Sequence, residues 1–180
     1  MEIHKTKIII VSLFALAFLE RVFFDLGPNI ELVTTAMLLT SVYWGIKQSF
    51  WLTLAILATT DIAIGNTNIF IFTWTGFLFP AILVDKFPGL AKSFGLEKIF
   101  RGTGAGIISN LFFFFWTNFG VWLLDSWGMY TNGLSGLMMS YIIALPFLKY
   151  QFISTLVFVP LGFTVLEVLL TPDRRLNLAE

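Results

Sequence analysis

Apolar residues along this chain gather into long runs that are separated by short segments rich in glycine, asparagine and charged residues. A helix of about 20 predominantly apolar residues crosses the ~30 Å hydrocarbon core of a bilayer. The pattern therefore predicts an all-α, polytopic membrane protein with six transmembrane helices. Their expected ranges are about 7–26, 30–46, 49–64, 69–84, 103–124 and 149–170.

One apolar run, residues 134–145, is shorter than the others. A helix rises 1.5 Å per residue, so this run reaches only ~18 Å and does not cross the hydrocarbon core. We expect it to form a short re-entrant or interfacial helix. The six longer runs leave no room for a second domain, so residues 1–180 are expected to form one transmembrane helical domain.

Lysine and arginine are unevenly distributed among the segments that connect the runs. Short cytoplasmic loops of membrane proteins carry an excess of these residues. If the N-terminus is cytoplasmic and the chain crosses six times, only Arg21 and Lys149 lie outside. The other basic residues then lie on the cytoplasmic side: Lys5, Lys7, Lys47, Lys86, Lys92, Lys98, Arg101, Arg174 and Arg175. The sequence thus predicts a multi-pass protein of the cytoplasmic (inner) cell membrane with both termini in the cytoplasm.

The composition narrows the functional classes. Hydrophobic residues make up 57% of the chain and charged residues 12%, and the mean hydropathy is +0.86. The formal net charge of +0 and the lack of a long basic stretch give no basis for nucleic-acid binding. With no cysteine and with His4 as its one histidine, the chain offers neither thiolates nor paired histidines to a metal. We therefore expect no cofactor and no enzymatic activity.

Two charged residues, Arg21 and Asp61, lie toward the ends of the first and third apolar runs. A charge at membrane depth costs roughly 2.5 to 3.5 kcal/mol, so such residues usually pair or face a polar cavity. Both lie at similar depth in their runs, which predicts a salt bridge near the outer surface. Two interpretations stay open: a structural ion pair that joins two helices, or charged groups that line a ligand-binding cavity.

Polar and aromatic side chains also gather at the outer end of the fifth run. Asn118 lies there, Trp122 follows one helical turn later, and Tyr130 lies in the segment beyond. An amide beside aromatic faces suits a flat polar ligand. The alternative is an aromatic belt at the membrane interface, which membrane proteins commonly have.

Small residues recur at helical spacing in two of the runs. Gly102 and Gly106 are four residues apart, and Ala55, Thr59 and Ala63 form a longer stripe on the third run. Such stripes let helix backbones approach closely. We expect each stripe to contact another helix, either of this chain or of a partner.

Six helices in a short chain, cytoplasmic termini and an outward polar pocket capped by loops resemble the S components of energy-coupling-factor (ECF) vitamin transporters, which bind the substrate. The chain is more specifically similar to a family of small uncharacterised bacterial membrane proteins that are themselves S-component-like. The residues that carry this similarity are Arg21, Pro28, Asn29, Asp61, the run Asn118-Phe119-Gly120-Val121-Trp122, Tyr130, Gly133, Leu134, Tyr141, Pro146 and Phe147.

The resemblance implies a substrate-capture subunit that binds a small polar or aromatic, vitamin-like metabolite in an outward-facing pocket for uptake. The ligand-binding residues expected from the sequence and the resemblance together are Arg21, Asn29, Asp61, Asn118, Trp122, Tyr130 and Tyr141. The chain has no nucleotide-binding motif, so the implied partners besides the lipid bilayer are a transmembrane coupling subunit and ATPases. The alternative function is a structural or assembly membrane protein without a small-molecule ligand.

Overall fold

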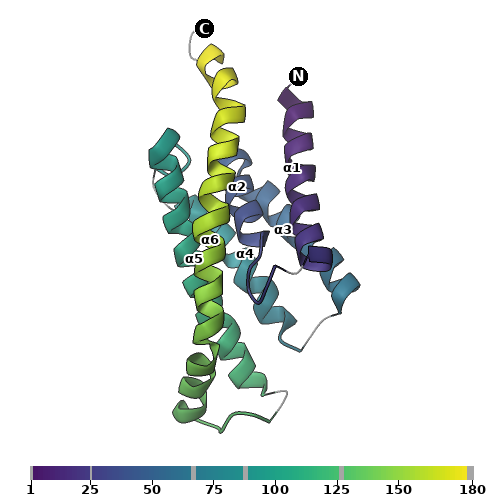
Figure 1. The fold of residues 1–180 in the computed structure, drawn as a ribbon, viewed down its shortest axis with the longest axis vertical. Coiled ribbons are helices and arrows are strands. Elements are labelled where there is room, and N and C mark those ends of the chain that lie inside the picture. Colours follow the sequence, from purple (N-terminus) through teal and green to yellow (C-terminus); the bar gives the residue numbers. More distant parts are fainter. Residues whose placement is uncertain (1, 25, 66–67, 87–88, 126–127, 178–180) are drawn as a thin grey trace.

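Figure 1 shows the computed structural model of the protein, which describes residues 2–24, 26–65, 68–86, 89–125 and 128–177. All regular structure in this part of the chain is helical. The elements are α1 (Glu2–Leu19), a short π-helical segment η1 (Glu20–Phe24), α2 (Val33–Trp44), α3 (Ile46–Ile64), α4 (Phe70–Lys86), α5 (Gly95–Leu124) and α6 (Leu134–Asn177). The predicted all-α class is confirmed, and six α-helices are present in the described residues.

The separate short helix predicted for residues 134–145 is wrong. These residues form the first turns of α6, a continuous helix of 44 residues with Pro146 inside it. A proline inside a helix removes one backbone hydrogen bond and costs about 3 kcal/mol. Contacts with α5 compensate, because the hydroxyl groups of Ser140 and Tyr141 donate to carbonyl oxygens of α5, each at 3.3 Å. Figure 1 shows the lower part of α6 bending while it stays beside α5.

Two other helix boundaries differ from the prediction because polar residues lie inside helices. α5 begins at Gly95 rather than near residue 103, and its first turns include a salt bridge of 2.8 Å between Glu97 and Arg101. The turn between α2 and α3 is at Gly45, whose φ of 93° favours glycine, and Lys47 belongs to α3. The lengths of the apolar runs therefore underestimated the lengths of α5 and α3 at the ends that carry charged residues.

α5 and α6 form a closely packed antiparallel pair. A Cβ atom added at Gly106 would lie 2.7 Å from Cγ2 of Thr155, and one added at Gly102 would clash with the ring of Phe163. The predicted role of these glycines in close helix packing is therefore confirmed. The small-residue stripe of α3 behaves differently, because Ala55, Thr59 and Ala63 are exposed.

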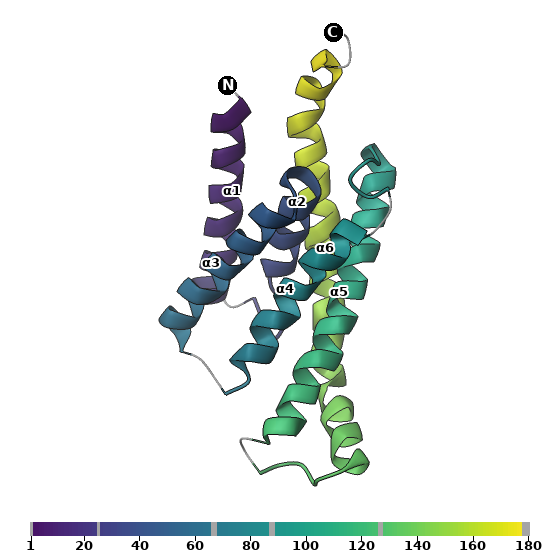
Figure 2. The same cartoon turned by 180° about the vertical axis from the view of Figure 1, so that it is seen from behind.

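α2 lies at the centre of the molecule, and every residue from Val33 to Val42 is buried. Figure 2 shows α1 and α3 on one side of α2 and the α5–α6 pair on the other, with α4 running diagonally across α2 from α3 toward α5. In both views the two termini lie at the same end of the molecule. Hydrogen bonds at this end join α1 to α2, from Trp44 to Thr6 at 3.2 Å, and α2 to α6, from Tyr43 to Glu167 at 2.5 Å.

Two described helical stretches are long and apolar enough to cross a membrane: residues 95–124 and residues 134–170. In the most apolar part of each, 28% of residues are buried, so most residues there keep at least part of their surface accessible. α2 has 12 residues and reaches only ~18 Å, which is less than the thickness of a hydrocarbon core. The fold is thus compatible with a membrane, although helix length and apolarity do not support six separate spans.

Candidate functional site

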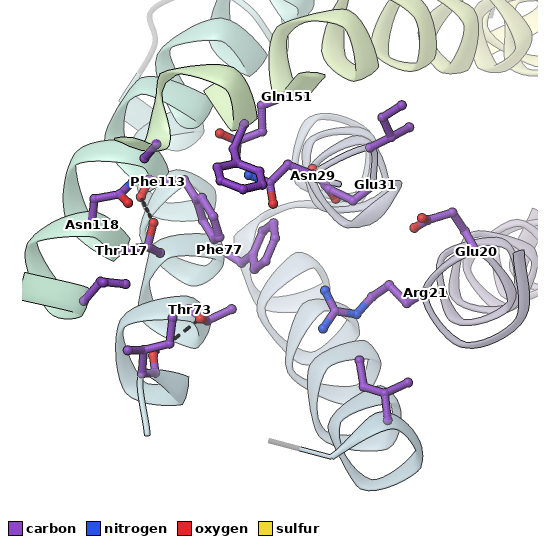
Figure 3. Close-up of a pocket in the computed structure, with 16 residues that line it drawn as sticks. Glu20, Arg21, Asn29, Glu31, Thr73, Phe77, Phe113, Thr117, Asn118 and Gln151 are labelled. Atoms are coloured by element: carbon purple, nitrogen blue, oxygen red, sulfur yellow. Dashed lines mark hydrogen bonds between the residues drawn. The ribbon is translucent and has the colours of Figure 1, made fainter. Parts of the chain in front are cut away.

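A cavity of about 460 Å³ lies beside η1, which follows the C-terminal end of α1 (Figure 3). Its walls come from η1, the segment between η1 and α2, and parts of α3, α4, α5 and α6. The residues that line it are Glu20, Arg21, Asn29, Ile30, Glu31, Ile64, Ile69, Thr73, Phe77, Phe113, Thr117, Asn118, Val121, Ala144, Phe147 and Gln151. Ligand pockets usually have volumes of about 300 to 1,000 Å³ and apolar walls with a few polar groups, and this cavity fits that description.

The π-helical segment η1 supplies two charged residues to the cavity. π-Helical turns are rare and occur frequently at functional sites, because the widened turn changes the direction of the side chains that follow. Here the turn starts at Glu20, which is 4% exposed and accepts a hydrogen bond of 3.3 Å from the backbone N–H of Leu32. Figure 3 shows Glu20 and Arg21 on the same side of the cavity.

Arg21 and Asp61 form the predicted salt bridge, which is confirmed at 3.2 Å between Nη2 and Oδ1. Arg21 Nε also donates to Oγ1 of Thr60 at 3.0 Å, and the second carboxylate oxygen of Asp61 accepts a hydrogen bond of 2.6 Å from Nε1 of Trp74. The side chains of Arg21 and Asp61 are only 17% and 10% exposed. The network joins η1, α3 and α4. Arg21 lines the cavity, whereas Asp61 lies behind it.

The segment between η1 and α2 is held in place by two reciprocal contacts with α6. Ser154 Oγ accepts from the backbone N–H of Glu31 at 3.1 Å and donates to its carbonyl oxygen at 2.9 Å. The Glu31 carboxylate accepts from the backbone N–H of Thr34 at 2.9 Å, which satisfies a donor at the start of α2. Asn29, also in this segment, adopts a φ of 59°, a conformation that asparagine tolerates better than most residues.

Glu31 lies outside the helices and is buried, with 8% of its surface exposed. Burial raises the pKa of its carboxyl above the ordinary value of 4.5, because the charged form loses its hydration. Hydrogen bonds from Thr34 and the positive charge of Arg21 counteract part of this effect on the pKa. A buried carboxyl in a cavity wall is suited to bind a ligand that carries a hydrogen-bond donor or a positive charge.

α5 and α6 form the opposite wall. Asn118 lines it, and its side-chain Nδ2 donates to the carbonyl oxygen of Phe114 at 2.8 Å. Gln151 of α6 is 2% exposed, and its side-chain oxygen Oε1 has no hydrogen-bond partner among the described residues. A buried acceptor without a donor costs about 1 to 3 kcal/mol, so this atom marks a position where a donor is missing.

Aromatic rings complete the walls. Phe77 of α4 and Phe113 of α5 are in contact, with ring centroids 4.5 Å apart (Figure 3), and Phe147 of α6 also lines the cavity. These rings offer flat apolar surface next to the polar groups of η1 and α6. The arrangement suits a small molecule with an apolar or aromatic body and a polar head.

The predicted site residues separate into three groups. Arg21, Asn29 and Asn118 line the cavity, and Asp61 supports Arg21 from behind. The other three do not line it: Trp122, Tyr130 and Tyr141.

The three residues outside the lining have local structural contacts. Trp122 donates from Nε1 to the carbonyl oxygen of Thr131 at 3.3 Å, and the backbone N–H of Tyr130 donates to Asp125 at 3.2 Å. Both hydrogen bonds hold the segment after α5. The Tyr141 ring packs on the Phe115 ring with centroids 5.4 Å apart, which holds α6 against α5.

Sequence reasoning missed several residues of the cavity. Glu20 and Glu31 were visible as charged residues beside the first turn, and the adjacency of Glu20 to Arg21 was a usable signal. Gln151 carried a weaker signal, as an amide inside an apolar helix. Nothing in the sequence placed Phe77 beside Phe113. Among the described residues, no group of three or more histidine, cysteine, aspartate or glutamate side chains could hold a metal ion.

Comparison with known families places the chain in one of them. A model of a family of unknown function, DUF6580, matches residues 1–177, and the chain therefore belongs to this family. No curated protein and no solved structure is similar enough to the chain to match it. A function for the chain consequently has to be inferred from the cavity itself.

Proposed function

We propose that this member of the family is an integral membrane substrate-capture subunit, which binds a small polar or aromatic metabolite in the cavity for uptake. The observation that carries the proposal is a preformed cavity of about 460 Å³ in which buried charged, amide and aromatic side chains converge. Such a combination is the usual composition of a small-molecule site. A structural ion pair between two helices would require neither the cavity nor the amide and aromatic side chains around it.

The distribution of polarity supports a membrane environment. Thr40, Thr53 and Lys98 are fully buried, whereas Ile62 and Phe100 are 85% and 74% exposed. A water-soluble monomer rarely exposes large contiguous apolar surfaces. With lipid as the solvent, exposed apolar side chains carry no such cost, and polar side chains gather inside the protein.

The proposed topology has six crossings with both termini in the cytoplasm and the cavity facing outward from the inner membrane. The start of α5 lies toward the same end of the molecule as the termini (Figure 1), and its first turns include Lys98 and Arg101. The excess of basic residues in cytoplasmic loops supports this orientation. The short α2 crosses only part of the bilayer thickness, but its neighbours surround it, so it needs no lipid-facing length of its own.

Uptake through this chain requires an energising partner. A coupling subunit and ATPases, as the ECF resemblance implies, would supply it. The exposed small residues Ala55, Thr59 and Ala63 on α3 give such a partner a smooth helix face. This part of the proposal depends on the resemblance and on that face.

A thermal-shift screen of small polar and aromatic metabolites on the detergent-solubilised protein tests the proposal. A ligand that binds only the folded state must raise its melting temperature. The variant Ala144→Phe fills the cavity from α6, where Ala144 is 6% exposed, and should abolish the shift. The matched control Ala63→Phe changes an exposed residue of α3 and should keep it. A screen without hits, or hits that Ala144→Phe leaves unchanged, would favour the structural or assembly role.

A further inference from the structure

We infer that the ligand of this cavity carries a cationic nitrogen, and that Glu20, Glu31 and Gln151 receive its N–H groups while the phenylalanine rings hold its body. The inference depends on the proposed capture function and names its substrate class. It also reverses the simplest interpretation of Arg21, in which the guanidinium binds an anionic ligand.

The positive charge of the cavity is already neutralised. Arg21 is the one basic residue among the described residues that line it, and its Nη2 lies 3.2 Å from the carboxylate of Asp61. Its Nε is used by Thr60 at 3.0 Å. An anionic ligand would therefore meet a guanidinium whose charge is already paired with an aspartate, and would gain less from it than from an unpaired arginine.

Acidic side chains outnumber basic ones at the cavity. Glu20 and Glu31 line the cavity with 4% and 8% of their surfaces exposed, and Asp61 lies directly behind Arg21. Of the described charged residues that line the cavity, two are acidic and one is basic, and the basic one is paired with Asp61. In an environment of low dielectric constant, a bound cation lowers the energy of this arrangement, since charges of one sign repel more strongly there than in water.

Gln151 gives an independent indication of the same chemistry. Its side chain is buried in the wall formed by α6, and Oε1 accepts no hydrogen bond from any part of the chain that the structure describes. The backbone carbonyl of Gln151 is used, because Nδ2 of Asn110 donates to it at 2.9 Å, so the helix itself is fixed in place. The missing group is a hydrogen-bond donor. An ammonium or a protonated ring nitrogen has N–H donors and no acceptor, which matches a carboxylate and an amide oxygen together.

The aromatic walls suit a cation as well. A positive nitrogen within about 6 Å of a phenylalanine ring is attracted to the ring face, and more strongly where water is excluded. Phe77 and Phe113 lie side by side in the lining (Figure 3), and Phe147 adds a third ring to it. The same rings accommodate a flat ligand body.

Matched probes distinguish the charge of the head from the shape of the body. Tryptamine, tryptophol and indole-3-acetate share an indole ring and a short side chain but end in an ammonium, a hydroxyl and a carboxylate. Phenethylamine, 2-phenylethanol and phenylacetate repeat the series on a smaller ring. Isothermal titration of each probe into the full-length protein in detergent should give the tightest binding for the amine of each series.

The outcomes separate the inference from the proposed function. If the alcohol or the carboxylate of a series binds as tightly as the amine, the cation inference is wrong and the capture function stands. If none of the six probes binds, the inference is wrong, and the capture function then depends on the broader metabolite screen alone.

Isosteric variants locate the interaction. Glu20→Gln and Glu31→Gln each replace an ionisable carboxyl by an amide of the same shape, and each should weaken amine binding by about tenfold or more, with a smaller effect on the alcohol. Glu97→Gln is the matched control, since Glu97 is exposed at the other end of α5. Gln151→Glu adds a carboxylate at the unpartnered acceptor and should tighten amine binding. Weaker amine binding in Gln151→Glu, or unchanged binding in both glutamate variants, would overturn the assignment.

Discussion

Nη2 of Arg21 lies 3.2 Å from Oδ1 of Asp61, and this contact joins η1 to α3 at the edge of the cavity. Trp74 of α4 holds the same carboxylate from its other side, at 2.6 Å. Three elements therefore meet at one ion pair. The pair neutralises the single basic residue among the described cavity-lining residues, so the same contact that stabilises the fold also determines which ligands the cavity favours.

The energetic value of this pair is measurable with a double-mutant cycle. Arg21→Ala or Asp61→Ala alone should cost about 3 kcal/mol of unfolding free energy, because each leaves a largely buried charge without its partner. The double variant should cost less than either. The exposed pair Glu97 and Arg101 is the control and should show a coupling of about 0.5 kcal/mol or less. Additive losses for Arg21 and Asp61 would show that the two charges are independent.

Close packing of α5 and α6 predicts a position-dependent effect of alanine. Gly106→Ala places a methyl group 2.7 Å from Thr155 and should destabilise the protein by about 1 to 3 kcal/mol. Gly104→Ala adds the same methyl group on the same helix, where no described atom lies within 4 Å, and should be neutral or stabilise by up to about 1 kcal/mol. Reversible unfolding in mixed micelles measures both. Equal effects at the two glycines would contradict this packing.

The raised pKa of the buried Glu31 carboxyl predicts that the stability of the protein depends on pH. Burial raises the pKa of its carboxyl in the folded state above 4.5, so the folded state binds this proton more tightly than the unfolded state does. The contribution of Glu31 to the free energy of unfolding is fully present below pH 4.5. It is lost as the pH rises through the raised pKa that Glu31 has in the folded state. The charged or titratable side chains nearby are Arg21, Glu20 and, behind Arg21, Asp61.

The variant Glu31→Gln keeps a hydrogen-bond acceptor for Thr34 but cannot ionise. Its melting temperature relative to the wild type should therefore rise as the pH increases from about 4 to about 8, whereas Glu97→Gln should show no such trend. A constant difference between Glu31→Gln and the wild type would mean that Glu31 keeps an ordinary pKa.

The proposed topology suits cysteine labelling, since the chain has no native cysteine. In intact cells, Asn132→Cys should react with a membrane-impermeant maleimide, because Asn132 is exposed in the segment that joins α5 to α6. Lys92→Cys, exposed between α4 and α5, should react only after the cells are opened. The reverse pattern would place the cavity on the cytoplasmic side.

Some of this architecture was predictable from the sequence alone. The number of helices follows from the apolar runs, because each run needs an apolar environment whatever the tertiary fold. Arg21 and Asp61 were predictable as partners, since a charge in an apolar run has few low-energy alternatives. Gly102 and Gly106 were predictable as packing positions, since small residues four apart on a helix favour a close neighbour.

Other features were not predictable, because they depend on contacts between distant segments. The apolar run 134–145 looked too short to belong to a spanning helix, yet α6 is continuous across Pro146 and forms hydrogen bonds to α5. Trp122 was placed in the site by its depth along α5, but depth does not determine which residues a side chain reaches, and it bonds to Thr131 instead. Gln151 gained its significance only when the fold left its oxygen without a donor from the described residues.

Native mass spectrometry of the protein released from its own membranes tests the central claim most directly, because it detects a bound small molecule whatever the chemical identity of that molecule. The wild type should carry the additional mass of a small metabolite. Ala144→Phe, which fills the cavity, should lose this mass, while Ala63→Phe should retain it. A wild type that carries only lipid, or an additional mass that persists in Ala144→Phe, would contradict the claim that this cavity captures a ligand.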